Sequence, residues 1–337
     1  MRKRIICIMI MCLITVIALA FLNRILLIKR SDGITDVIEF YAQKNNTIDV
    51  LVVGSSHAGM NLDSATFWDK EGISAYVMWG SIQPFWNSYY FIKEALETQK
   101  PKVIVLEVDA VTYDFEYSDS SRQITNTAGL KLSLNKISSV MASTEPSKWI
   151  GLLLGYPYYH DRYSEITKND FNYFPWSKGL ENQKGTSVRF GTYAYVPEYC
   201  GDITECMPIY EKEERYLRKI IEYCQDIGQP LVLISTPVLT RRNNQPYYNT
   251  VKNIADEYKV EYYNFNLMDE ETGFNGTHYW QDANHLNTEG ARTITSWLAR
   301  KLREEYDLVD HRGDENYESW QINSDMLNSE YNAMSAQ

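Results

Sequence analysis

Short apolar runs alternate with longer amphipathic stretches along most of the chain. The apolar runs predict strands at residues 48–53, 73–78, 102–108, 230–235 and 260–265. Residues 88–99 and 209–227 carry apolar side chains at helical spacing, and Gly228 ends the second stretch. Strands that alternate with helices are typical of βαβ units. The pattern therefore predicts an α/β fold, a three-layer α/β/α sandwich with a five-stranded parallel sheet of flavodoxin-like form.

Residues 113–208 interrupt this alternation after the third predicted strand. The segment is rich in aromatic residues, as in GYPYYHDRY and NDFNYFPW. Because a structureless loop of this length is uncommon in a compact domain, we expect an insertion that folds over the edge of the sheet. Its aromatic rings either line a groove for carbohydrate or only pack the insertion onto the core. We place the α/β domain at residues 31–308 and a polar tail at residues 309–337, with one short helix around residues 317–331.

The first thirty residues form a separate segment. Three basic residues precede an apolar run at residues 5–22, which is nearly long enough to cross a bilayer. The basic flank favours a cytoplasmic N-terminus and an extracytoplasmic C-terminal domain. A cleaved signal peptide is the alternative, because the Ala-Leu-Ala at residues 18–20 has the form of a peptidase site. Hydrophobic length favours the uncleaved anchor, so residues 1–30 predict a single-pass protein of the cell membrane.

Charge and cysteine content narrow the possible partners. The chain has 33 basic and 44 acidic residues, and six of the basic ones lie in the first thirty residues, which leaves a net charge of −17 beyond them. A domain this acidic is a poor ligand for nucleic acid. Cys200 and Cys206 can close a small disulfide in an oxidising compartment, but Cys224 leaves the connectivity open. The cysteine spacing does not indicate zinc, and we predict no structural metal.

Reactive side chains follow the first and last predicted strands. GSSH comes after the first strand and DANH after the fifth. The carboxyl ends of parallel strands meet at one edge of the sheet, where ligands commonly bind. A serine becomes a nucleophile when a base takes its proton and a third group orients the base. Ser56, His285 and Asp282 can fill these roles, and Gly54 permits the tight turn before the serine.

The pairing of VLVVGSSHAG with DANHLNTEGA resembles the SGNH, or GDSL-type, hydrolase superfamily. The resemblance implies that Ser56 is the nucleophile and that Asp282 and His285 activate it, with Ser55 in place of the family's aspartate. Gly80 in VMWGSIQP matches the family's second block. The backbone amides of Ser56 and Gly80 are then expected to form the oxyanion hole, and no cofactor is implied.

The third block departs from the family pattern. Most of these hydrolases carry an asparagine after the third strand, whereas this chain reads Glu107-Val108-Asp109. An ionised carboxylate cannot donate a hydrogen bond to an oxyanion. The anchor, the GSS variant and LEVD are most similar to exported proteins that accompany membrane-bound O-acyltransferases in alginate acetylation and in D-alanyl transfer to teichoic acid. This likeness implies a polysaccharide or teichoic acid-type glycan as substrate and a membrane-bound O-acyltransferase as partner.

Three further residues are candidates for substrate binding. His57 follows the nucleophile, Asp109 follows the third strand, and His160 lies among the aromatic residues of the insertion. Asp109 can orient a sugar hydroxyl, or it can cap a turn.

The sequence thus predicts an extracytoplasmic serine esterase or O-acyltransferase that acts on acyl groups, most simply acetyl, of a surface or secreted polysaccharide. One alternative is a non-catalytic SGNH-fold module that assists a membrane-bound O-acyltransferase or binds a glycan. Another is a flavodoxin-like phosphate binder, in which Ser55 and Ser56 only cap the following helix or hold an anion there.

Overall fold

The computed structural model describes residues 1–29, 32–187, 189–274 and 277–335. Its sheet has five parallel strands in the order β2-β1-β3-β4-β5. The strands are β1 (Val50–Gly54), β2 (Ala75–Trp79), β3 (Val103–Glu107), β4 (Leu231–Ser235) and β5 (Glu261–Asn264). Each begins and ends within two residues of its predicted bounds. The predicted α/β/α sandwich is confirmed.

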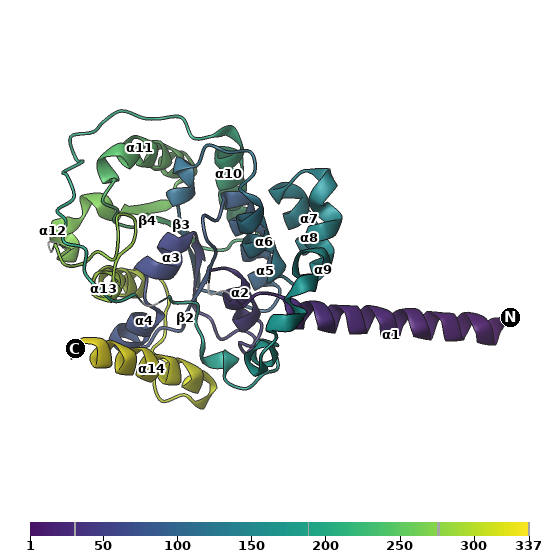
Figure 1. Ribbon diagram of the computed structural model, residues 1–337. Helices are drawn as coiled ribbons and strands as arrows, with labels where there is room; N and C mark the ends of the chain where they lie inside the picture. The colour runs from purple at the N-terminus through teal and green to yellow at the C-terminus, as the bar shows by residue number, and fades with distance from the viewer. Residues whose placement is uncertain (30–31, 188, 275–276, 336–337) are drawn as a thin grey trace.

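Helices cover both faces of the sheet, because strands β1 to β4 are apolar and buried throughout. One face carries α2 (Ile34–Phe40), α5 (Phe85–Leu96), α10 (Glu211–Asp226) and α11 (Arg241–Tyr258). The other face carries α3 (Ser56–Asn61), α4 (Ser64–Glu71) and α13 (Thr288–Glu305). Figure 1 shows α5 and α10 on one side of the strands and α4 and α13 on the other.

The insertion begins with short helices. They are η1 (Asp109–Thr112), α6 (Ser120–Ala128), α7 (Leu134–Ser143), η2 (Pro146–Lys148), α8 (Trp149–Leu154), α9 (Tyr156–Tyr159), η3 (His160–Glu165), η4 (Lys168–Asn172) and η5 (Leu180–Asn182). Helix α7 packs on α5, and α6 packs on α2. The short elements after the fifth strand are η6 (Phe265–Leu267) and α12 (Asp269–Thr272).

The rest of the insertion, residues 184–187 and 189–208, has no regular structure, and we call it the strap. It begins against the edge strand, where Lys184 accepts the N–H of Val77 at 2.9 Å and Gly185 accepts the indole N–H of Trp79 at 2.8 Å. It ends against α11, where Arg242 pairs with Asp202 at 2.6 Å. Between these points it curves around the outside of the domain (Figure 1). The insertion therefore folds over the sheet edge, as expected.

The polar tail forms η7 (Glu315–Tyr317) and α14 (Glu318–Ser335), and α14 packs on α4. The helix that we expected near residues 317–331 is present. Trp320 anchors it, since this ring is buried and its indole N–H donates to the carbonyl of Ala75 at 3.0 Å. The tail is therefore attached to the outer edge of the sheet.

Helix α1 (Arg2–Leu26) projects from the domain (Figure 1). It is long and apolar enough to cross a membrane, with a mean hydropathy of 3.2 over its most apolar part. The possible disulfide is not formed, because both Cys200 and Cys206 are free thiols. Cys200 is instead buried, and its sulfur lies 3.5 Å from the carbonyl oxygen of Asn266.

Candidate active site

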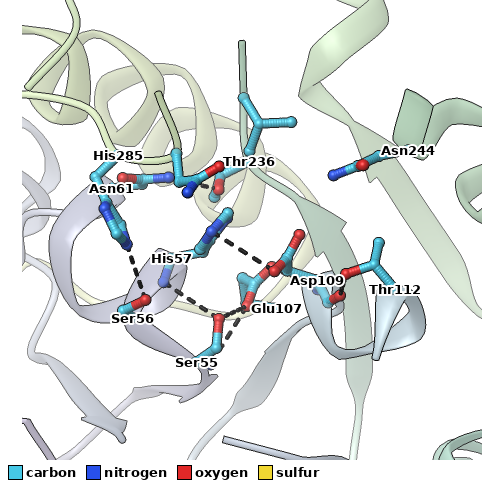
Figure 2. A network of polar contacts seen from close by, with 12 residues as sticks. Ser55, Ser56, His57, Asn61, Glu107, Asp109, Thr112, Thr236, Asn244 and His285 are labelled. Carbon is cyan, nitrogen blue, oxygen red and sulfur yellow. Dashed lines mark hydrogen bonds and ion pairs between the residues drawn. The ribbon is translucent and has the colours of Figure 1, made fainter. Parts of the chain in front are cut away.

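The two segments that we expected to meet do so at the carboxyl edge of the sheet. Ser56 is the first residue of α3, directly after β1, and its Oγ lies 2.8 Å from Nε2 of His285. The other ring nitrogen, Nδ1 of His285, lies 3.0 Å from both carboxylate oxygens of Asp282. Figure 2 shows His285 reaching down to Ser56. All of these distances are within hydrogen-bond range.

The loop that carries Asp282 and His285 is held by its own backbone. Asp282 Oδ1 accepts the N–H groups of Asn284 at 2.8 Å and His285 at 3.0 Å. Partial burial raises the pKa of Asp282, but these bonds and the contact with His285 offset it, so the pKa lies below its usual value. Asp282 is therefore ionised at neutral pH and can orient the imidazole and stabilise its charged form.

Asn61, which the sequence did not single out, joins this loop to α3. Its Oδ1 accepts the N–H of Leu286 at 2.8 Å, and its Nδ2 donates to Thr236 Oγ1 at 2.8 Å. Asn61 is fully buried. Because Leu286 follows His285, this side chain fixes the base relative to the helix that begins with the nucleophile.

Glu107, in the third block, lies behind the nucleophile and not in front of it. Its Oε2 accepts the N–H of Ser55 at 3.3 Å and the hydroxyl of Ser55 at 2.9 Å, and its Oε1 accepts the N–H of Asp109 at 2.7 Å. A Cβ at Gly54 would lie 2.6 Å from the Cβ of Glu107, so a glycine is needed here. Burial, together with the charge of Asp109, raises the pKa of Glu107 to about 8. Glu107 thus binds the turn that presents Ser56 and donates to no oxyanion.

His57 and Asp109 lie beside the triad. His57 Nε2 is 3.6 Å from Asp109 Oδ2, and Tyr248 donates its hydroxyl to Asp109 Oδ1 at 3.2 Å. The His57 ring meets the His285 ring edge-on, with centroids 5.2 Å apart. Burial lowers the pKa of His57, although Asp109 opposes the shift, so the ring is neutral at pH 7. Figure 2 shows His57 and Asp109 to the right of the contact between His285 and Ser56.

These groups open into one cavity of about 780 Å³. Its size is in the range of small-molecule sites in proteins. Its walls bring together Ser56 and His285, the start of α11, the strap, the loop after β2 and the segment that follows α1. The lining residues are Lys29, Asp32, Ser56, His57, Met60, Trp79, Ser81, Ile82, Asp109, Thr112, Tyr113, Arg189, Thr240, Asn244, Asn284 and His285. Two of the three candidate substrate-binding residues, His57 and Asp109, are therefore in the wall.

The third candidate, His160, lies elsewhere. It begins η3, an exposed element of the insertion that contacts α1, and it is outside the lining of the cavity. Its aromatic neighbours in the sequence suggested a substrate groove, but this part of the insertion packs beside α1 and not over the triad.

Gly80 stands beside the nucleophile turn, since Gly54 pairs with Trp79 in the sheet. Its N–H points to the carbonyl of Gly54 at the long distance of 3.4 Å, and a Cβ at this position would lie 1.9 Å from Asn126 Oδ1. Its role as an oxyanion donor stays a prediction. The next residue but one, Ile82, has a φ of +44° and lines the cavity. Such a backbone is strained for a β-branched residue, and strain of this kind often occurs at functional sites.

Within the described residues, no group of three or more His, Cys, Asp or Glu side chains is arranged to hold a metal ion. The hydrogen bond between Ser56 Oγ and His285 Nε2 has the geometry that nucleophilic attack by a serine requires.

No protein-family model matches this sequence, and no curated protein matches it. Among solved structures, the fold is similar to that of a protein from Bacteroides fragilis described as a "putative acylhydrolase". The two chains share 8% identity with a TM-score of 0.37, over 78% of this chain and 90% of the other. A likeness of this extent leaves the chemistry to be argued from the side chains themselves.

Proposed function

We propose that this protein is a serine-dependent acyl esterase or O-acyltransferase. The observation that carries the proposal is the continuous hydrogen-bonded row from Ser56 through His285 to Asp282. The three residues come from two segments more than two hundred residues apart, and Ser56 and His285 line the cavity. The resemblance of these two segments to the SGNH hydrolase blocks supports the same assignment.

The reaction follows from the geometry. Ser56 Oγ attacks the ester carbonyl while its proton passes to Nε2 of His285. The tetrahedral intermediate collapses to an acyl-Ser56 ester, and the departing alcohol takes the proton from His285. Water or an acceptor alcohol then enters, loses a proton to His285 and attacks the acyl carbonyl. The second tetrahedral intermediate collapses, Ser56 Oγ takes the proton from His285, and the free acid or the new ester leaves. Asp282 orients His285 and stabilises its charged form throughout. The amides of Ser56 and Gly80 are the proposed oxyanion donors.

The proposed substrate is a small acyl ester, most simply acetyl, on a surface or secreted polysaccharide such as a teichoic acid-type glycan. The polar groups of Asp109 and Asn244 support this assignment, because they line the cavity and can bind hydroxyl groups. Likeness to the exported acyltransferase-associated proteins supports the same class of substrate, with a membrane-bound O-acyltransferase as partner. Helix α1 is the proposed single-pass anchor, with the α/β domain on the extracytoplasmic side.

The test is hydrolysis of p-nitrophenyl acetate by the purified full-length chain. We expect Ser56→Ala to abolish the serine-dependent rate and Ser55→Ala to retain a measurable rate, because Ser55 is bonded to Glu107 and caps α3. Loss of activity in Ser55→Ala with full activity in Ser56→Ala would contradict the assignment of the nucleophile.

Two observations favour the alternative of a non-catalytic glycan-binding or assembly module. Glu107 occupies the third block without serving as a donor, and the Gly80 amide points to the Gly54 carbonyl. A binding module would retain binding of acetylated oligosaccharides in His285→Ala and would release no acetate in the wild-type form. Release of acetate that depends on His285 would exclude this alternative.

A further inference from the structure

The last turn of α1 is built into the α/β domain. Leu26 and Leu27 are buried, and two basic side chains cap the free carbonyl groups of the helix end. Arg162 donates to the carbonyls of residues 25, 26 and 27 at 3.3, 3.1 and 3.0 Å, and Lys29 donates to those of residues 24, 25 and 27 at 2.7, 2.9 and 2.6 Å. Asp170 lies 2.6 Å from Arg162 and 3.6 Å from Lys29. The direction of α1 relative to the domain is therefore fixed.

Two parts of the insertion flank α1 just before this turn. On one side, the Phe21 ring of α1 stacks on the Phe174 ring, with the ring centroids 5.1 Å apart. The centroids of the Phe174 and Trp176 rings are 4.7 Å apart. On the other side, α8 ends at Gly155, where a Cβ would lie 2.6 Å from Oδ1 of Asn23. Figure 1 shows α8 and α9 beside the inner end of α1.

Both flanking parts expose large apolar side chains. Ile150 and Leu154 lie one turn apart on α8, hence on the same face, and are 72% and 58% exposed. Trp176 is 75% exposed, whereas the other seven of the eight tryptophans are buried or half-buried. An exposed indole is unusual in this chain and needs an explanation.

The length of α1 sets the level of the membrane. Residues 5–22 form a helix of about 27 Å, close to the ~30 Å thickness of the hydrocarbon core. The polar boundary of the bilayer then lies near Asn23. Phe21 and Asn23, the residues that contact the two flanking parts, stand at this boundary. Tryptophan is enriched at this depth because its ring is apolar and its N–H is polar.

We propose that Ile150, Leu154 and Trp176 form a membrane-contact surface that rests in the headgroup region of the bilayer crossed by α1. This surface goes beyond the catalytic proposal and rests on the anchor proposed above. It adds a second attachment to the single helix and holds the domain in one orientation. Lys29, which lines the catalytic cavity, is three residues past the end of α1 and within about 10 Å of it. The cavity therefore lies close to the membrane surface, where a glycan or acyl carrier attached to the membrane would reach it.

The experiment uses the full-length chain reconstituted into vesicles of phosphatidylcholine brominated near the glycerol end of its acyl chains. Bromine quenches tryptophan fluorescence at short range. We expect quenching of the wild-type protein and loss of most of that quenching in Trp176→Phe. The substitution should not disturb folding, because the Trp176 side chain is exposed. Trp280→Phe is the matched control, since Trp280 is buried in the loop before Asp282 and its indole N–H finds no partner among the described residues. This control should be quenched like the wild-type protein.

Flotation of the vesicles separates this proposal from the anchor itself. Protein that floats with the vesicles but shows equal quenching in the wild-type and Trp176→Phe forms would overturn the membrane-contact surface and leave the anchor intact. Protein that does not float would overturn both. Neither result would bear on the triad. Ester hydrolysis by the protein in detergent tests the triad separately.

Discussion

The carboxyl group of Glu107 accepts both the N–H and the hydroxyl of Ser55, one residue before the serine that bonds His285. The same carboxyl group accepts the N–H of Asp109, whose side chain lies in the cavity wall. Glu107 therefore connects the nucleophile turn to the wall of the cavity without facing the cavity itself. In this position Glu107 stabilises the turn that carries Ser55 and Ser56 and does not line the cavity.

The burial of Glu107 predicts a pH-dependent stability. The folded protein binds this proton more tightly than the unfolded chain, because its pKa rises from 4.5 to about 8. The unfolded chain then holds fewer protons between these values, so the free energy of unfolding falls as the pH rises from about 5 to 8. Glu107→Gln mimics the protonated form and should flatten this part of the profile in urea titrations. Parallel profiles for the two proteins would show that Glu107 is ionised in the folded state.

The bond from Asn61 to Leu286 predicts a positioning role. Asn61→Ala leaves the buried N–H of Leu286 without its acceptor, a cost of about 1–3 kcal/mol, and frees the His285 loop. We expect kcat to fall by about tenfold to a hundredfold, because His285 is no longer aligned with Ser56. KM should change little, because the shape of the cavity is unaltered. Thr236→Val removes the other partner of Asn61 and should change kcat far less. Equal losses in the two variants would argue for a general packing effect.

Two glycines of positive φ test the attachment of the strap. Gly185 has a φ of +77° and stands so close to Val77 that a Cβ would lie 1.7 Å from the carbonyl oxygen, whereas Gly179 has a φ of +94° and nothing within 4 Å. Gly179→Ala should cost about 1–2 kcal/mol for backbone strain alone. Gly185→Ala should cost about 3 kcal/mol or more, because the strap must also move off β2. Chemical denaturation measures both, and similar losses would mean that the strap adjusts without leaving the strand.

Strands β1 to β4 could be predicted from the sequence because they are buried on both faces and are therefore nearly continuous apolar runs. The meeting of Ser56 with His285 could be predicted because GSSH lies at the end of β1 and DANH comes after β5, at the same edge of the sheet. Helix α11 was missed, since RRNNQPYYN is polar and contains Pro246 inside the helix. The missing proline N–H falls in its second turn, and packing of Tyr248 and Val251 on the core outweighs this loss.

The other functional residues lacked a local signal. The partners of Asn61 are 175 and 225 residues away in the sequence, so no short motif reveals their contact. The sequence suggests only that Glu107 replaces a donor, and its contacts in the structure show that it accepts bonds from Ser55. His160 was misplaced because aromatic content does not say which surface an insertion covers. In the structure, that part of the insertion lies against α1.

The central claim is that His285 activates Ser56 as a nucleophile. The most direct measurement is the rate and site of labelling by a fluorophosphonate, followed by intact mass and peptide mapping of the full-length protein in detergent. We expect one adduct per chain, located on Ser56, absent in Ser56→Ala and formed at least about a hundredfold more slowly in His285→Ala, the usual scale for loss of a general base. An adduct on another residue, or an unchanged rate in His285→Ala, would contradict the assignment of Ser56, His285 and Asp282 as a catalytic triad.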